Sequence, residues 1–230
     1  MLDTTNVVDS IEVIDLEPQG PCTALFPPVD TIITSHSSWT KTNFSSRIGM
    51  FQQDTIDEGD IVMLGNSLTE QGGNWSNKLG VSDAKNRGIS GDNTDGVLAR
   101  LNELICRNPS TVFLMIGTND LWTSYTAEKI AAQIHLIGTT LKQELPDTHV
   151  VIQTIMPAAH GNDKKAKLLA INDLLRGFDE RIYSLEDTHL HMSNEEGDLP
   201  QAYTTDGVHL NEAGYTKWAS FLKEIIAAHN

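Results

Sequence analysis

The chain has 230 residues and a mass of 25.3 kDa, which is long enough to bury the core of one domain. Apolar residues make up 39% and charged residues 20%, and this ordinary composition argues against a largely disordered chain. The 16 Lys and Arg residues against 31 Asp and Glu residues give a net charge of −15. A chain this acidic repels phosphate groups. We therefore predict that it binds neither nucleic acid nor anionic lipid surfaces.

Membrane and secretion signals are missing from the visible sequence. No apolar run approaches the ~18 residues of a membrane span, and the first residues lack a basic stretch followed by an apolar one. We therefore predict a cytoplasmic protein, with secretion after loss of a signal as the alternative. Cys22 and Cys106 are too few for a disulfide framework, and we predict two free thiols rather than one bridge. The oligomeric state stays open, a homo-oligomer included.

The first forty residues differ from the rest of the chain. Four prolines fall between residues 18 and 30, and no hydrophobic period persists there, although residues 7–14 could hold a short strand. We predict an extension over residues 1–40 that wraps over the domain, with a floppy tail as the alternative. The domain itself is assigned to residues 41–230 and is expected to begin with a short helix over residues 43–53.

Strands and helices alternate from residue 59 onward. Short apolar runs at 61–64, 111–116 and 149–155 predict three buried strands, and a fourth is expected within 182–192. Residues 86–93 have two glycines within four positions and are interpreted as a flexible loop before the next helix.

Apolar residues at helical spacing predict the elements between the strands. They indicate helices over 97–105, 130–145 and 168–178, and a last helix whose N-cap is Asn211. Alternation of this kind predicts an α/β fold, a three-layer α/β/α sandwich around a flavodoxin-like, mostly parallel sheet. In such sheets the ligand site lies beyond the carboxyl ends of the strands.

A serine follows the first predicted strand, within Gly65-Asn66-Ser67-Leu68-Thr69. On a tight strand-to-helix turn its hydroxyl is exposed, and its N–H lies near a helix N-terminus, where negative charge is favoured. The segment is not a Gly-x-Ser-x-Gly elbow, because position 69 is threonine. Taken alone, a capped turn is the simpler interpretation of Ser67.

A carboxylate and a histidine stand close together near the end of the chain. Asp206 precedes His209 by three residues, so it can reach Nδ1 around one turn and leave Nε2 as a base. Residues 86–93 and 117–120 add glycines and an asparagine that can supply oxyanion donors, although loop and cap roles also explain each segment. The order Ser, Asp, His is one that a catalytic triad allows, and the whole set suggests acyl transfer.

These segments together resemble the ordered sequence blocks of the SGNH hydrolase superfamily, also called GDSL esterases and lipases. The resemblance runs from about residue 60 to the C-terminus and is closest to bacterial sialate O-acetylesterase-like and platelet-activating-factor acetylhydrolase-like members. One position departs from the pattern: Asn66 stands where the family usually has aspartate. The substitution removes a negative charge beside the serine and leaves the triad intact.

The resemblance implies a role for each matching residue. Ser67 would be the nucleophile, His209 the base and then the acid, and Asp206 the group that orients the imidazole. The oxyanion hole would consist of the N–H groups of Ser67 and Gly91 and the side-chain amide of Asn119. It also implies that no metal or organic cofactor is needed, and that the substrate is a small ester. We predict a serine esterase for short acyl groups, acetyl first, carried by a carbohydrate or another small polar alcohol.

Several weaker interpretations remain. Trp122 and Met156 are candidates for the wall of the substrate pocket. His189 and His191 could form a metal pair on one face of the last strand, but no third ligand has a suitable spacing, so we predict no metal site. The alternatives to an acetylesterase are a thioesterase or lysophospholipase on the same scaffold, and a non-catalytic carbohydrate-binding module.

Overall fold

The structure is a computed structural model that describes residues 22, 24–28, 30–178 and 181–229. The short strand predicted within residues 7–14 lies outside these described residues. Among the described helices none is long and apolar enough to cross a membrane.

Five parallel strands form one sheet in the order β2-β1-β3-β4-β5. The predicted parallel α/β sandwich is therefore confirmed. The three apolar runs are the neighbouring strands β1, β3 and β4 at its centre. The strands are β1 (Ile61–Gly65), β2 (Ala84–Gly88), β3 (Thr111–Met115), β4 (His149–Gln153) and β5 (Ser184–Glu186).

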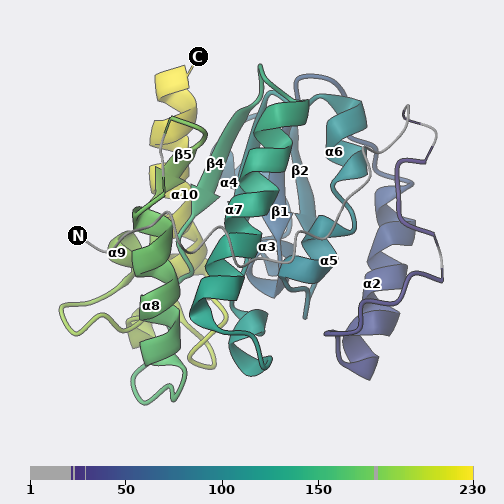
Figure 1. The fold of residues 1–230 in the computed structure, drawn as a ribbon. Coiled ribbons are helices and arrows are strands. Elements are labelled where there is room, and N and C mark those ends of the chain that lie inside the picture. The colour runs from purple at the N-terminus through teal and green to yellow at the C-terminus, as the bar shows by residue number, and fades with distance from the viewer. Residues whose placement is uncertain (1–21, 23, 29, 179–180, 230) are drawn as a thin grey trace.

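Helices cover both faces of the sheet, as Figure 1 shows with α7 and α8 in front of the strands and α10 behind them. The helix predicted at 97–105 is two helices separated by a turn at Arg100, whose side chain points into the protein. The helices are α2 (Ser38–Phe51), α3 (Ser67–Gln71), α4 (Trp75–Leu79), α5 (Thr94–Leu98), α6 (Asn102–Arg107), α7 (Ala127–Glu144), α8 (Lys165–Arg176), α9 (Thr188–Met192) and α10 (Glu212–His229), with 3₁₀ turns η1 (Asn119–Trp122) and η2 (Gln201–Tyr203).

Alternation along the strands divides the core into two layers. In β3, Val112 and Leu114 pack in one apolar cluster with α5 to α8, whereas Phe113 and Met115 pack in the other with α3, α4 and α10. Successive side chains of a strand point to opposite faces, so a continuous apolar run is what a strand covered on both sides requires.

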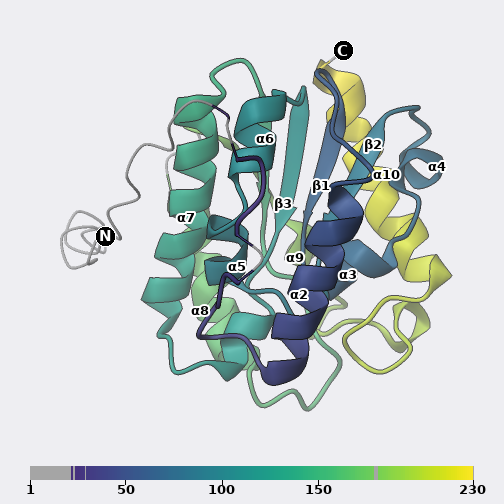
Figure 2. The same ribbon diagram turned by 90° about the vertical axis from the view of Figure 1, so that its right-hand side faces the viewer.

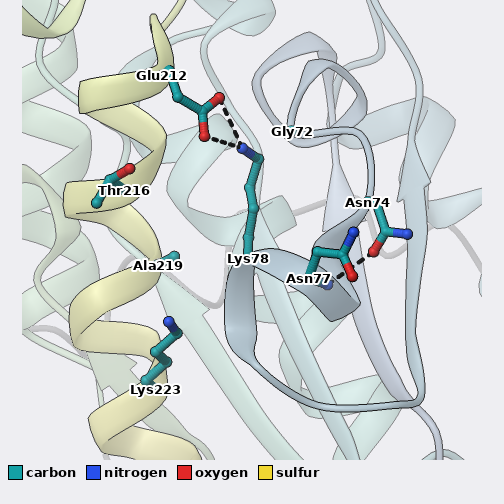
Figure 3. Close-up of a pocket in the computed structure, with 8 residues that line it drawn as sticks. All are labelled: Gly72, Asn74, Asn77, Lys78, Glu212, Thr216, Ala219 and Lys223. Carbon is teal, nitrogen blue, oxygen red and sulfur yellow. Dashed lines mark hydrogen bonds and ion pairs between the residues drawn. The ribbon is translucent and has the colours of Figure 1, made fainter.

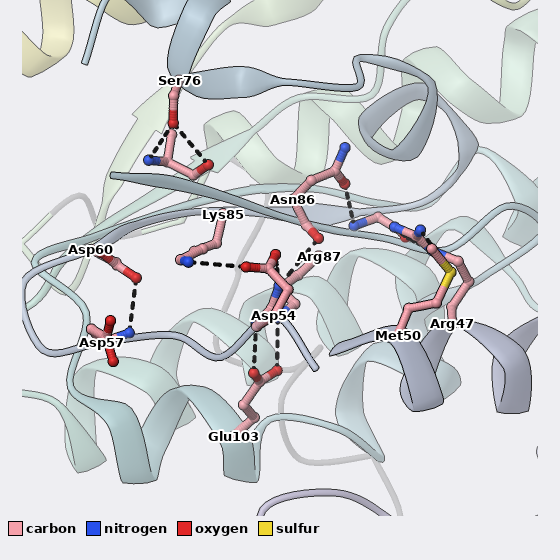
Figure 4. A network of polar contacts seen from close by, with 12 residues as sticks. Arg47, Met50, Asp54, Asp57, Asp60, Ser76, Lys85, Asn86, Arg87 and Glu103 are labelled. Carbon is pink, nitrogen blue, oxygen red and sulfur yellow. Dashed lines mark hydrogen bonds and ion pairs between the residues drawn. The ribbon is translucent and has the colours of Figure 1, made fainter. Parts of the chain in front are cut away.

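The polar edge strand β2 was not predicted, because its sequence Ala-Lys-Asn-Arg-Gly has no apolar run. Its side chains are held by polar partners instead. Arg87 is fully buried and donates from Nη2 and Nε to Glu103 of α6 at 2.8 and 2.9 Å, and Lys85 pairs with Asp54 at 3.0 Å (Figure 4). A buried guanidinium requires such a partner, and only the folded chain provides it.

Helix α2 lies at the β2 edge of the sheet (Figures 1 and 2). It begins at Ser38, five residues before the predicted start, because the Ser37 hydroxyl accepts from Thr40 N at 3.0 Å and caps the helix. The helix runs through the position where the extension was predicted to end.

The last predicted strand covers only three residues. Asp187 follows it and accepts from Leu190 N at 3.1 Å, which begins helix α9. His189 and His191 thus lie on a helix, and the strand-face arrangement predicted for them is wrong. In the described part of the chain no group of three or more His, Cys, Asp or Glu residues could hold a metal ion.

The two cysteines form a disulfide between Cys22 and Cys106, with Cα atoms 5.5 Å apart. The prediction of two free thiols is therefore wrong. The bond joins the N-terminal segment to α6, beside a hydrogen bond from the Asn102 side chain to the Ala24 carbonyl. The partners are 84 positions apart in the sequence, so their proximity depends on the path of the chain over the sheet.

Candidate active site

The serine lies at the junction of β1 and α3, at the carboxyl edge of the sheet. Asn66 is the N-cap of α3, and its Oδ1 accepts from Leu68 N at 3.1 Å. This cap function needs only a side-chain oxygen, which asparagine supplies as aspartate would. The turn leaves Ser67 as the first residue of the helix, with its N–H at the helix N-terminus.

Ser67, His209 and Asp206 form a continuous chain of hydrogen-bonded groups. Nε2 of His209 lies 3.0 Å from Oγ of Ser67, and Nδ1 lies 2.7 Å from Oδ2 of Asp206. The side-chain hydrogen bond from His209 lowers the pKa of Asp206 to about 2, and the N–H groups of His209 and Val208 support the shift, which slight burial opposes. The carboxylate is thus ionised at neutral pH and holds the proton on Nδ1.

A short loop fixes this histidine. Residues 204 and 210 form an antiparallel bridge, and the Thr204 hydroxyl donates to the His209 carbonyl at 2.7 Å and accepts from Gly207 N at 2.9 Å. Directly after the loop, Asn211 caps α10 by accepting from Gly214 N at 3.0 Å, as predicted. The imidazole is therefore held by a hydrogen-bonded turn packed on the start of a long helix.

The two remaining candidate oxyanion donors come from separate loops that contact each other. Gly91 has φ +84°, a left-handed conformation that favours glycine, and the Thr40 side chain lies directly against its Cα. Asn119 begins η1 and donates from Nδ2 to the carbonyl of Asp92 at 2.7 Å. An amide has two N–H groups, so the second is the one available to a substrate oxygen.

The predicted substrate-contact residues have different environments. The side chain of Trp122, at the end of the 3₁₀ turn that Asn119 begins, is 57% exposed. Met156 is only 2% exposed and packs in the apolar cluster with α10. Of the two, the indole of Trp122 is the one presented to solvent near the site.

A groove of about 480 Å³ lies between α4 and α10 (Figure 3). Lys78 spans it and pairs with Glu212 at 3.0 Å. Ser67, Asp206 and His209 do not line it. Its lining residues are Gly72, Asn74, Asn77, Lys78, Glu212, Thr216, Ala219 and Lys223.

Asp120, for which the sequence favours a loop or cap role, is fully buried. Its carboxylate accepts from Thr94 Oγ1 at 2.5 Å and from Thr94 N at 3.2 Å, which joins the Asn119 turn to the start of α5. Burial raises the pKa of Asp120 to about 6, although the Thr94 hydrogen bonds oppose the shift. Because its partners are distant in the sequence, no local pattern identifies it.

Known proteins are similar to this chain in sequence. The model of the GDSL-like lipase/acylhydrolase family matches residues 63–217. Platelet-activating factor acetylhydrolase IB subunit alpha1 of Rattus norvegicus is 31% identical over 177 residues, which cover 72% of this chain and 75% of that protein. The alpha2 subunit of Bos taurus is 28% identical over 177 residues, covering 74% and 76%.

Solved structures share the fold. A GDSL-like lipase from Bacteroides thetaiotaomicron superposes with a TM-score of 0.69 at 21% identity, covering 82% of this chain and 98% of that one. An acetylxylan esterase from Geobacillus stearothermophilus gives 0.58 at 19% identity, covering 74% and 96%. Fold, family model and relatives agree, and this chain belongs to the GDSL-like lipase/acylhydrolase family and is an ester-hydrolysing enzyme.

Proposed function

We propose that this enzyme releases short acyl groups, acetyl first, from esters of small polar alcohols through an acyl-enzyme on Ser67. The observation that carries the proposal is the line of groups from Ser67 Oγ through His209 to Asp206, with contacts of 3.0 and 2.7 Å. A nucleophile, a base and an orienting acid in this geometry are what acyl transfer requires.

In the first half-reaction, Ser67 Oγ attacks the ester carbonyl carbon and its proton passes to Nε2 of His209. The carbonyl oxygen becomes an oxyanion, which the N–H groups of Ser67 and Gly91 and the amide of Asn119 stabilise. His209 then gives its proton to the leaving alcohol as the C–O bond breaks. Water attacks the acyl-enzyme by the same route, which releases the acid and restores the serine.

Two observations support an acetyl ester on a carbohydrate. The names of a curated relative, an acetylhydrolase, and of a structural neighbour, an acetylxylan esterase, both specify the acetyl group. The triad is also open, since the Asp206 side chain is 54% exposed, and the exposed face of Trp122 nearby suits stacking on a sugar ring.

The test is acetate release from a panel of acetylated mono- and oligosaccharides, beside p-nitrophenyl acetate, octanoate and palmitate. We expect the acetyl esters to be cleaved fastest and Ser67→Ala to release no acetate above background. A preference for the octanoyl or palmitoyl ester would instead indicate a thioesterase or lysophospholipase. If intact protein turns over no ester and takes up no fluorophosphonate, a non-catalytic module is the better description.

A further inference from the structure

A histidine that precedes the family match is buried against the candidate oxyanion loop. His36 lies before α2, whereas the family model begins at residue 63. Its Nε2 is 3.0 Å from Oδ1 of Asp92, and both side chains are 0% exposed. A buried imidazole on a buried carboxylate is a specific contact, because either group without a partner would be costly to bury.

Asp92 connects this histidine to the loops that carry the candidate oxyanion donors and, through Arg100, to the end of β1. Its Oδ2 accepts from Arg100 Nε at 3.0 Å, and Arg100 Nη2 donates to the carbonyl of Gly65 at 3.1 Å, at the end of the strand that carries the serine. The carbonyl of Asp92 accepts from the Asn119 amide at 2.7 Å, and Gly91 is its neighbour in the chain. A movement of Asp92 would therefore move both loop donors relative to Ser67.

The hydrogen bonds define where the proton lies. A carboxylate only accepts, so Nε2 of His36 carries the proton and donates it to Oδ1 of Asp92. The only other donor on that oxygen among the described contacts is Asn93 N at 3.1 Å. Removing His36 would leave Oδ1 of Asp92 with Asn93 N as its donor and would loosen the hold on this carboxylate.

The absence of a side chain on α5 also leaves space for the contact between His36 and Asp92. Gly96 of α5 has no side chain, and a Cβ there would fall on Asp92 Oδ1 and within 2.8 Å of the His36 ring. Other residues of the same N-terminal segment hold the loop from outside. Asn43 Nδ2 donates to the Ser90 carbonyl at 3.0 Å, and Arg47 Nε to the Gly88 carbonyl at 3.1 Å.

We propose that His36 is a positioning residue, which holds the oxyanion donors of Gly91 and Asn119 in place through Asp92. The inference rests on the proposed function. The segment around His36 is then part of the active site, although it lies outside the family match. In effect the N-terminal segment supports an oxyanion hole whose donors lie within the residues that the family model matches.

The sharpest test uses two amides of different length. In His36→Gln the side-chain NH₂ can occupy the position of Nε2 and reach Asp92, whereas in His36→Asn it is too short. We expect kcat for p-nitrophenyl acetate to fall about tenfold or more in His36→Asn, with KM changed less than twofold, since the lost stabilisation belongs to the transition state. His36→Gln should recover most of the lost rate.

The rate of fluorophosphonate labelling of Ser67 gives a second readout that needs no ester substrate, and it should fall in parallel. His135→Gln is the matched control. It removes a part-buried imidazole of α7, whose Nδ1 lies 2.7 Å from the Tyr183 hydroxyl. This control should lower the melting temperature without changing kcat or the labelling rate. His36→Leu, of similar volume, replaces His36→Asn if that variant does not fold.

The outcomes separate the two proposals. If wild-type kcat persists in folded His36→Asn, or if both amide variants lose activity equally, the positioning role is wrong. If the wild type shows no Ser67-dependent ester turnover, the proposed function fails. The role of His36 is then decided by the labelling rates where Ser67 takes up the fluorophosphonate, and it is wrong as well where Ser67 takes up none.

Discussion

Two buried arginine–carboxylate pairs flank the ring of Phe51 on α2, and they serve different parts of the molecule. The guanidinium carbon of Arg87 lies 4.7 Å from the ring centroid and that of Arg100 lies 6.0 Å from it. Arg87 pairs with Glu103 at 2.8 Å, and Arg100 pairs with Asp92 at 2.9 Å. In type of group, burial and distance the two pairs are nearly alike.

Their other contacts differ. Arg87 joins the edge strand β2 to α6 and reaches the carboxylate of Asp54 at 3.5 Å (Figure 4). Arg100 also holds the end of β1 through the Gly65 carbonyl, and its partner Asp92 supports the Asn119 amide. The same chemistry thus holds a polar edge strand in one place and an active-site loop in the other. Substitutions near Arg100 and near Arg87 should therefore have different effects.

The largest effect is expected from the nucleophile, which lies on the Arg100 side. Ser67→Ala should reduce kcat roughly 10⁴-fold or more, because no other group forms the acyl-enzyme. The melting temperature should stay within a few degrees of the wild type, since the serine is at a turn. Residual turnover within tenfold of the wild type, after contamination is excluded, would show that another residue is the nucleophile.

Replacing each arginine in turn distinguishes an effect on the free energy of unfolding from an effect on kcat. Arg87→Leu and Arg100→Leu each remove the arginine partner of a buried carboxylate, which costs about 3–5 kcal/mol of the free energy of unfolding. We expect only Arg100→Leu to reduce kcat of the folded enzyme as well. Urea unfolding combined with initial rates at low temperature checks this, and equal kcat losses in the two variants would contradict the distinction.

The disulfide belongs with the Arg87 region, because Cys106 lies on α6 next to the helix turn that carries Glu103. The double variant Cys22→Ser, Cys106→Ser should lower the free energy of unfolding by about 2–4 kcal/mol and leave kcat unchanged. Thiol titration of the unfolded wild type should find no free thiol before reduction. Two free thiols there would overturn the disulfide.

The last prediction concerns Asp120, whose carboxylate joins the turn that begins at Asn119 to the start of α5. Its pKa is raised from 3.8 to about 6, so the folded state keeps a proton that the unfolded chain releases between these values. Its contribution to the free energy of unfolding therefore falls as pH rises from 4 to 7, by about 3 kcal/mol in total.

Asp120→Asn removes this titration and keeps an oxygen that accepts from Thr94. The difference in free energy of unfolding between variant and wild type should grow in favour of the variant over that pH range. Parallel pH profiles for the two proteins would show that Asp120 is not the group responsible.

Local sequence patterns were enough to predict much of the fold. The apolar runs of β1, β3 and β4 indicated buried strands, and the helical stripes indicated α7, α8 and α10 close to their observed ranges. Asn211 was identified as a cap from its position alone. These features depend on neighbours within a few residues, so the sequence contains their physical cause.

The candidate triad could also be predicted from the sequence, because its residues follow strand ends or lie three positions apart. In contrast, β2, the disulfide and the His36–Asp92 contact depend on partners far away in the chain. Arg87 is buried in a polar strand only because Glu103 meets it, and His36 only because Asp92 does. Sequence by itself determined which apolar segments are buried and which residues can react. The tertiary structure decided which polar groups pair, since the burial of a charge is favourable only where the path of the chain brings a partner to it.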